Sequence, residues 1–154
     1  MKELMENIFV ADFAKLFISV ICSAFIGWER ERRDKAAGLK RHILIGFGAC
    51  LVTIIGLKFT QGDDTGQLLR VFQGIITGVG FVGAGAIIHQ GADVRGVTTA
   101  AGIWVIAAIG MTVGVGEYML AFSSAVFIVL LLRLLYFLED RIIRASTRDD
   151  TNSG

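Results

Sequence analysis

A short charged segment offers the densest group of side chains able to bind a metal ion. Glu29, Glu31 and Asp34 lie close together in the sequence, and carboxylate oxygens are the ligands that Mg²⁺ prefers. Basic residues stand among them and compete for the same carboxylates. On a helix, Glu29 would pair with Arg33, and Glu31 with Lys35, as ordinary neighbours one turn apart. The residues leave two interpretations open, a solvated ion-paired helix end or a carboxylate cluster at the mouth of a cation site.

A glycine pattern farther along resembles a nucleotide-binding motif but is better explained by helix packing. Gly78, Gly80 and Gly83 have the spacing GxGxxG, yet they lie inside an apolar run of spanning length, without the preceding strand that the motif needs. Small residues at GxxxG spacing let membrane helices approach closely. We expect the third and fourth apolar segments to form the packed centre of a bundle. The expected packing positions are Gly74, Gly78, Gly80, Gly83, Gly85, Gly110 and Gly114.

Other residue types give no sign of catalysis or of a metal centre. His42 and His89 are isolated and form no HExxH or Cys/His pattern. Cys22 and Cys50 each lie in an apolar run and are expected to be small buried side chains. An enzyme of the hydrolase or transferase type needs a nucleophile, a base and oxyanion donors in mutual reach, and the sequence offers no such set. We predict a protein that is not an enzyme and that uses no cofactor and no bound metal.

The elements that must position these residues are long and apolar. Hydrophobic residues make up 54% of the 154 residues, with 19 glycines and no proline, and the mean hydropathy is +0.65. The apolar runs are continuous rather than alternating, which favours membrane helices over a β-barrel. We predict an all-α bundle of about five transmembrane helices, over residues 13–28, 43–57, 71–88, 97–114 and 119–138. The transmembrane domain is expected over residues 1–145, followed by a disordered polar tail over residues 146–154.

The distribution of lysine and arginine predicts the orientation. Ten of them lie before the second helix, before the fourth helix and after the fifth, whereas Lys2, Lys58 and Arg70 lie on the other side. Basic residues favour the cytoplasmic side. We therefore expect a multi-pass protein of the bacterial inner (plasma) membrane, with its N-terminus outside and its C-terminus in the cytoplasm. The net charge of +1 provides no global basic field for nucleic acid.

Several charges fall inside or at the edges of the predicted spans. Asp12, Lys15, Arg70 and Arg133 are such residues, and charges there are costly and usually face protein or water. Asp12 and Arg70 are both expected near the outer face, where they would pair. Glu29 and Arg133 are expected to meet near the inner face. The alternative is that each long side chain only extends its charge to the interface.

Three segments together resemble a known family. The first is Glu29-Arg-Glu31 followed by KAAGL over residues 35–39, and the second is RVFQGIITGVGFVGAGAII over residues 70–88. The third contains VRGVTTAAGIW over residues 94–104 and AAIG over residues 107–110. This combination is similar to the signature of the MgtC/SapB family, and the similarity covers nearly the whole chain.

The resemblance implies a function in adaptation to low magnesium and in virulence. It also implies an action on the F-type ATP synthase rather than Mg²⁺ transport, as described for the member that names the family. Many members carry a soluble C-terminal domain, whereas this chain ends about sixteen residues after the fifth predicted helix. Lys40-Arg41 stands where members often have Arg-Thr. The polar positions that match the family's motifs are Glu29, Glu31, Lys35, Arg70, Gln73, Arg95, Thr98 and Thr99.

Two functions from different classes follow. The preferred one is a non-enzymatic regulator of membrane energetics and Mg²⁺ homeostasis, which binds a membrane complex such as the ATP synthase through its glycine-rich helices. The alternative is a small oligomeric Mg²⁺ or other cation transporter. A cation pathway favours carboxylates near the membrane midplane, and the second to fourth predicted helices contain none. The GxxxG faces predict a homodimer in either case.

Overall fold

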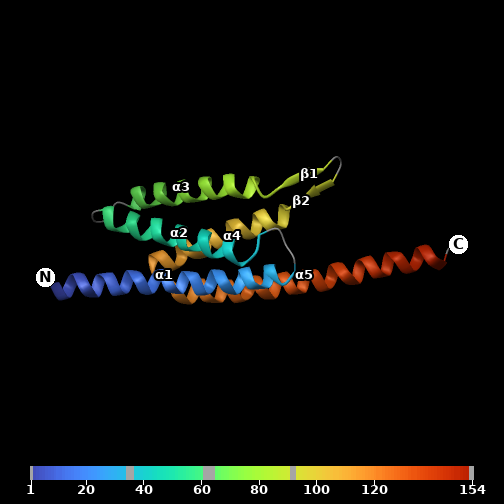
Figure 1. Cartoon of the computed structure of the whole chain (residues 1–154), viewed down its shortest axis with the longest axis horizontal. Helices are drawn as coiled ribbons and strands as arrows, with labels where there is room; N and C mark the ends of the chain where they lie inside the picture. The colour runs from blue at the N-terminus through green and yellow to red at the C-terminus, as the bar shows by residue number, and fades with distance from the viewer. Residues whose placement is uncertain (1, 34–36, 61–64, 91–92, 153–154) are drawn as a thin grey trace.

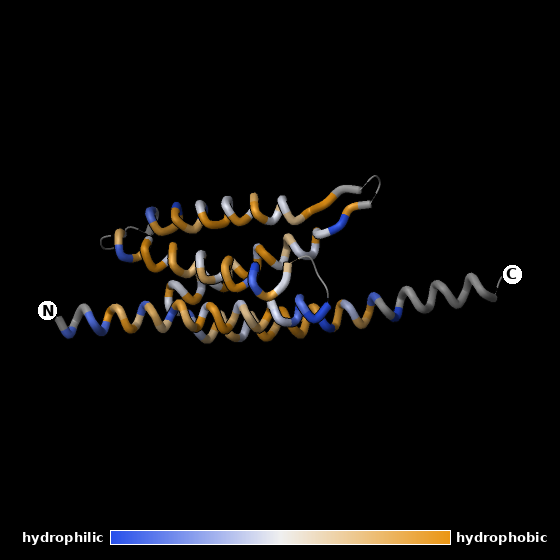
Figure 2. The backbone as a smooth tube through the Cα atoms, viewed as in Figure 1, coloured by the Kyte–Doolittle hydropathy of each residue, from blue (hydrophilic) through white to orange (hydrophobic). Residues whose placement is uncertain are grey.

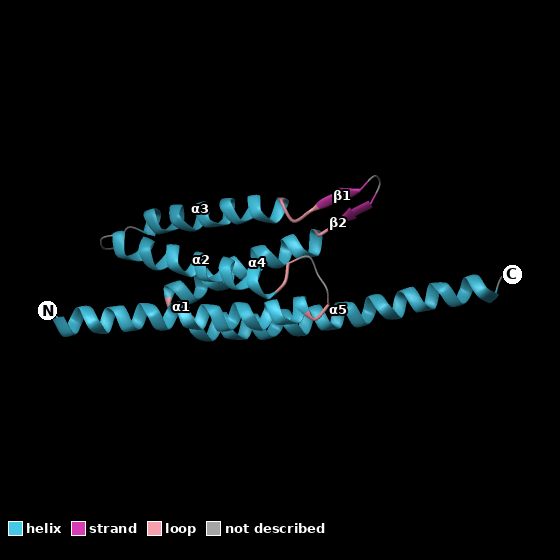
Figure 3. Cartoon of the chain, viewed as in Figure 1, coloured by secondary structure: helices cyan, strands magenta, loops and turns pink. Residues whose placement is uncertain are grey.

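Five long helices make up most of the molecule. The structure is a computed structural model that describes residues 2–33, 37–60, 65–90 and 93–152. The helices run along its long axis (Figure 1): α1 (Lys2–Glu31), α2 (Leu39–Phe59), α3 (Thr65–Ala84), α4 (Val97–Val115) and α5 (Tyr118–Asn152). Two short strands, β1 (Ile88–Gln90) and β2 (Asp93–Arg95), pair antiparallel between α3 and α4 (Figure 3). The predicted all-α bundle is confirmed.

All five helices are long and apolar enough to cross a bilayer. The spanning segments within them have 19 to 26 residues, and a helix needs about 20 to cross the hydrocarbon core. Apolar residues fill the middle of the helices, whereas the hydrophilic ones gather toward their ends (Figure 2). Many large apolar side chains on the outside are exposed, Phe17 and Phe127 among them. This is the surface expected of a bundle whose solvent is lipid.

The core lies between α1, α2, α4 and the first half of α5. Its buried members include Ile26, Cys50, Ile106 and Val129. Both cysteines are buried and free, as the sequence predicted. Lipid tails are as apolar as leucine, so helix association depends on close packing and hydrogen bonds rather than on water exclusion.

Glycines bring α2 and α4 into close contact. A Cβ atom on Gly110 would lie 2.4 Å from the carbonyl oxygen of Gly46, and one on Gly114 would lie 2.7 Å from Thr53 Cβ. Ser19 Oγ on α1 donates to the same Gly46 oxygen at 2.9 Å. The packing role predicted for Gly110 and Gly114 thus matches the geometry, because no larger residue fits there.

Helix α3 lies at the edge of the bundle, so the prediction that it belongs to the packed centre is wrong. Only 6% of its spanning segment is buried, against 44% for α4. Gly74, Gly78 and Gly80 have open space where a side chain would be, and Gly85 meets only carbonyl oxygens of its own helix end. Gly83 alone among these glycines lies against a neighbouring helix, since a Cβ atom added there would lie 3.6 Å from Ala100 Cβ. The central role belongs to α2, whose small residues face both α1 and α4.

The ends of the elements differ from the predicted ones. Helix α1 begins at Lys2, because the segment before residue 13 holds good helix formers and no glycine or proline. Helix α5 continues to Asn152, so most of the tail predicted as disordered is helical. The hairpin was not predicted. Helix α3 ends at Ala84, next to Gly85, and Ile88 pairs with Arg95 instead of extending the helix.

The connections place the basic segments together. The α1–α2 connection, the hairpin and the distal half of α5 all lie at one end of the molecule, opposite the N-terminus (Figure 1). This end is called the basic end below. Its location in the cytoplasm stays a prediction from the charge distribution.

Candidate functional site

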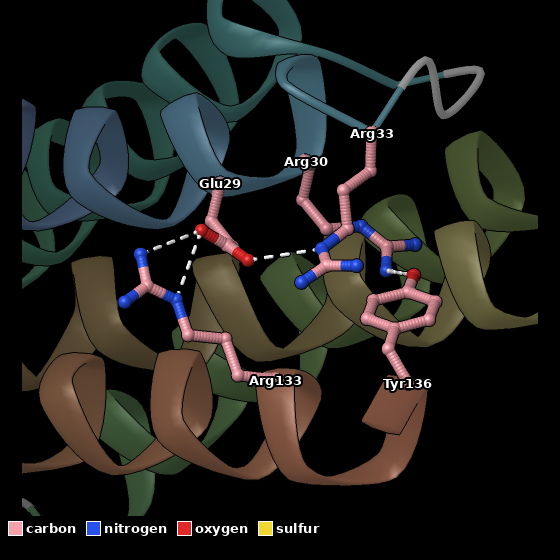
Figure 4. A network of polar contacts seen from close by, with 5 residues as sticks. All are labelled: Glu29, Arg30, Arg33, Arg133 and Tyr136. Carbon is pink, nitrogen blue, oxygen red and sulfur yellow. Dashed lines mark hydrogen bonds and ion pairs between the residues drawn. The ribbon is translucent and has the colours of Figure 1, made fainter. Parts of the chain in front are cut away.

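Glu29 is the centre of a polar network at the basic end. It is only 4% exposed, and it joins two helices (Figure 4). Arg33, just beyond the end of α1, donates from Nε to Glu29 Oε1 at 3.1 Å. From α5, Arg133 donates to its Oε2 through Nε at 3.2 Å and Nη2 at 2.9 Å. The predicted pairs of Glu29 with Arg33 and with Arg133 are both confirmed.

A second pair of arginines meets Tyr136 beside this centre. Arg30 is 1% exposed and donates from Nη1 to the Tyr136 hydroxyl at 2.7 Å. Arg33 stacks on the ring of the same tyrosine, with its guanidinium carbon 4.4 Å from the ring centroid. Figure 4 shows the two guanidinium groups side by side over the tyrosine. Four side chains of α1 and α5 are therefore interlocked around Glu29.

The start of α2 is held by two neighbouring contacts. Glu31 Oε2 accepts a hydrogen bond from the backbone N–H of Leu39, which satisfies one of the free donors at the helix start. His42 is fully buried, and its Nδ1 lies 2.9 Å from the carbonyl oxygen of Gly38. Lys35, predicted to pair with Glu31, lies outside the described residues. Glu31 thus serves as a helix cap.

The hairpin and the start of α4 position the other motif residues of this end. Arg95 ends β2, Thr98 is exposed and Thr99 is 4% exposed. Gly96 between them has a φ of +92°, and a Cβ atom there would lie 2.1 Å from the carbonyl oxygen of Ala86. Only glycine suits this junction, since it combines left-handed backbone with a close backbone contact.

The opposite end holds the remaining charges. Asp12 forms an ion pair with Lys58 of α2, so the predicted pair of Asp12 with Arg70 is wrong. Helix α1 lies against α2, whereas α3 lies outside α2. Lys15 donates to the Gly114 carbonyl oxygen at 3.2 Å, and exposed Arg70 lines a pocket of about 450 Å³ between α2 and α3. Arg70 is therefore far along the bundle from Glu29, whereas Gln73 lies nearer the middle of α3.

This geometry binds helices together rather than exposing reactive groups. Glu29 and Asp12, two acids within the span of α1, both have cationic partners. The described part of the chain contains no group of three or more His, Cys, Asp or Glu residues that could hold a metal ion. Free carboxylate oxygens for Mg²⁺ are therefore scarce in this region.

Some residues of this polar network were not singled out from the sequence. Arg30, Tyr136 and His42 are central here, and Ser19 and Ser23 are fully buried on the same helix as Arg30. The sequence does contain a spacing pattern that points to some of these residues. Ser19, Ser23 and Gly27 follow one another at four-residue steps, which marks one face of α1, and Arg30 lies one turn beyond.

The fold and this network define a class, and the comparisons with known proteins define the family. Five apolar helices of bilayer length, two of which are joined by an ion pair at the basic end, make this a multi-pass helical membrane protein. The chain belongs to the MgtC family, whose family model matches residues 16–141.

Three relatives show how far the similarity extends. "Putative magnesium transporter YhiD" of Escherichia coli K12 is 39% identical over 134 residues, which are 84% of this chain and 62% of that protein. "Protein MgtC" of Salmonella typhimurium is 37% identical over 73% of this chain and 47% of its own length. "Protein SapB" of Bacillus subtilis is 37% identical over 83% and 58%. The chain thus spans about half to three fifths of these relatives. No solved structure matches it.

Proposed function

We propose that this protein is a non-enzymatic regulator in the bacterial inner membrane, where it serves magnesium homeostasis by binding another membrane complex. The name of its relative YhiD, a putative magnesium transporter, supports the link to magnesium. The observation that carries the binding role is the outward face of α3.

One face of α3 is polar or small along its whole length. The positions that share it follow alternating steps of four and three residues, and all are exposed: Gly66, Arg70, Gln73, Thr77, Gly80 and Ala84. Gln73 lies near the middle of the spanning segment Gly66–Ala84. A polar amide facing hydrocarbon is costly, since lipid tails offer no hydrogen-bond partner. In the membrane, this face is suited to another protein helix.

The partner suggested by the family resemblance is the F-type ATP synthase. Small residues at Gly74, Gly78 and Gly80 permit a close approach of a foreign helix, and Gln73 can then bond across the contact. Binding to the membrane part of this complex would alter proton movement and hence membrane energetics. This regulation needs no catalytic group on the protein.

Proton pumping by reconstituted ATP synthase tests the proposal. We expect co-reconstituted wild-type protein to reduce ATP-driven acidification of the vesicles. Gly78→Leu should abolish the effect, since it blocks close approach without touching the protein's own fold. Gly48→Leu is the matched control, because Gly48 on α2 also has open space around it. Unchanged pumping with wild-type protein, or equal loss with Gly48→Leu, contradicts the proposal.

The second candidate is a small oligomeric Mg²⁺ transporter. It is favoured by the name of YhiD, a putative magnesium transporter, and by the exposed face of α3. A homodimer joined through this face would place Gln73 and Thr77 of two copies around a shared axis. The pairing of Asp12 with Lys58 and of Glu29 with two arginines weighs against it, because these carboxylates already have counter-charges.

Mg²⁺ flux into proteoliposomes loaded with a magnesium-sensitive dye separates the two candidates. The regulator predicts no flux above empty liposomes from protein that is folded and inserted. Saturable flux that falls in Asp12→Asn or Glu31→Gln would make transport the primary activity.

A further inference from the structure

We propose that the basic end carries a binding site for the phosphate group of an anionic phospholipid. The site is a pocket of about 410 Å³ lined by Glu29, Arg32, Arg33 and Arg133. It goes beyond the proposed regulation, and it is independent of the face of α3.

The pocket has more positive than negative charge. Three guanidinium groups surround one carboxylate, and Glu29 is already bonded to two of them. The side chains of Arg33 and Arg133 remain 39% and 54% exposed. Each guanidinium carries five N–H donors, of which Glu29 takes one from Arg33 and two from Arg133. The remaining donors suit an acceptor such as phosphate, which arginine binds in a planar, bidentate manner.

Arg30 adds a further charge behind the pocket. It is 1% exposed, and within the described part of the chain its Nε and Nη2 atoms are buried without a hydrogen-bond partner. A buried, incompletely paired cation is costly and strengthens the attraction for an anion nearby. Arg30 also binds Tyr136, on which Arg33 stacks. It therefore positions Arg33 as well as contributing charge.

The surroundings favour a lipid over free phosphate. Glu29 lies two residues before the end of the span Glu6–Glu31, which places the pocket at the boundary of the apolar zone. The same two helices expose large apolar side chains within one turn of Glu29 or Arg133 along the helix: Phe25, Trp28, Leu134 and Phe137. A phosphate group in the pocket would thus have acyl chains lying on this surface, and Trp28 would lie at head-group level.

Lipid binding to the delipidated, detergent-purified protein tests the proposal. Native mass spectrometry would measure the affinity for phosphatidylglycerol beside zwitterionic phosphatidylcholine. We expect clear preference for phosphatidylglycerol and about fivefold weaker binding in Arg32→Gln, since one basic residue near an anionic membrane contributes about 1 kcal/mol. Arg32 lines the pocket without bonding Glu29, so its loss leaves the network intact. Arg32→Glu should weaken binding further.

Lys40→Gln is the matched control, since Lys40 is exposed at the same end but outside the pocket. It should change the affinity less than twofold. Equal binding of both lipids, or an equal loss in Lys40→Gln, would mean that only general surface charge acts and would overturn the site. Displacement of the lipid by millimolar inorganic phosphate would overturn the lipid assignment in favour of a free phosphate ligand.

Discussion

Glu29 shows how a single charge is kept at the end of an apolar helix. Its carboxylate receives three hydrogen bonds from two arginines, Arg33 just beyond the end of α1 and Arg133 on α5. Hydrogen bonds to charged groups are stronger than neutral ones. The contact between α1 and α5 therefore depends strongly on one side chain.

Replacing Glu29 by glutamine should weaken the bundle. Glutamine keeps the size but loses the negative charge, so the free energy of unfolding should fall by roughly 1–3 kcal/mol. Thermal unfolding of detergent-purified protein measures this. Glu6→Gln is the control, since Glu6 is exposed near the start of α1. Equal stability of wild type and Glu29→Gln would contradict the structural role.

Gly96 is a second residue whose replacement has a defined cost. Gly96→Ala should destabilise the protein by about 1–3 kcal/mol, because alanine disfavours positive φ. Its Cβ would also collide with the Ala86 carbonyl oxygen. Gly102→Ala on α4 is the comparison, since a Cβ there meets nothing closer than 3.7 Å. A larger loss in Gly102→Ala, measured by the same unfolding assay, would refute this explanation.

At the scale of elements, the sequence predicts what is local and misses what depends on neighbours. The five apolar runs predict the five helices. The opposite charges of Glu29 and Arg133 predict the contact between α1 and α5, since both residues lie near the same end of their helices. Asp12 was assigned the wrong partner, because hydropathy does not tell which helices are adjacent. For the same reason the position of α3 was predicted wrongly. Its glycines have the spacing of a helix contact, but most of them face outward.

The glycines at the contact between α2 and α4 and the exposed glycines of α3 should respond oppositely to substitution. Gly110→Ala must separate α2 from α4, because the new Cβ would lie 2.4 Å from the Gly46 oxygen, and we expect a loss of about 1–3 kcal/mol. Gly78→Ala meets open space and should stabilise the isolated chain by about 0.5–1 kcal/mol, as alanine does in helices. Thermal unfolding of the detergent-purified monomer compares both. Destabilisation by Gly78→Ala would mean that α3 is packed in a way that the structure does not have.

At the scale of the whole molecule, an odd number of spans separates the two termini. The three basic segments lie together at the end opposite the N-terminus (Figure 1). The positive-inside rule then predicts that this end faces the cytoplasm. The structure shows that the three basic segments lie at one end, and their charges predict which side of the membrane that end faces.

Labelling of single cysteines checks this orientation. Lys40→Cys at the basic end should stay unlabelled by a membrane-impermeant maleimide in intact spheroplasts. Glu117→Cys, exposed between α4 and α5, should be labelled. The native Cys22 and Cys50 are buried and should add little background. The reverse pattern would show that the N-terminus faces the cytoplasm.

The length of α5 has a mechanical consequence. The helix has 35 residues and is held to α1 at Arg133 and Tyr136, well before its end at Asn152. From Arg133 to Asn152 it extends about 28 Å, at 1.5 Å per residue. With that contact as a fulcrum, a tilt of about 10° in the membrane would swing the distal end by about 5 Å over this length. A tilt of the part inside the bilayer is thus carried to the distal end of α5, over an arm slightly longer than the part of the helix before Arg133.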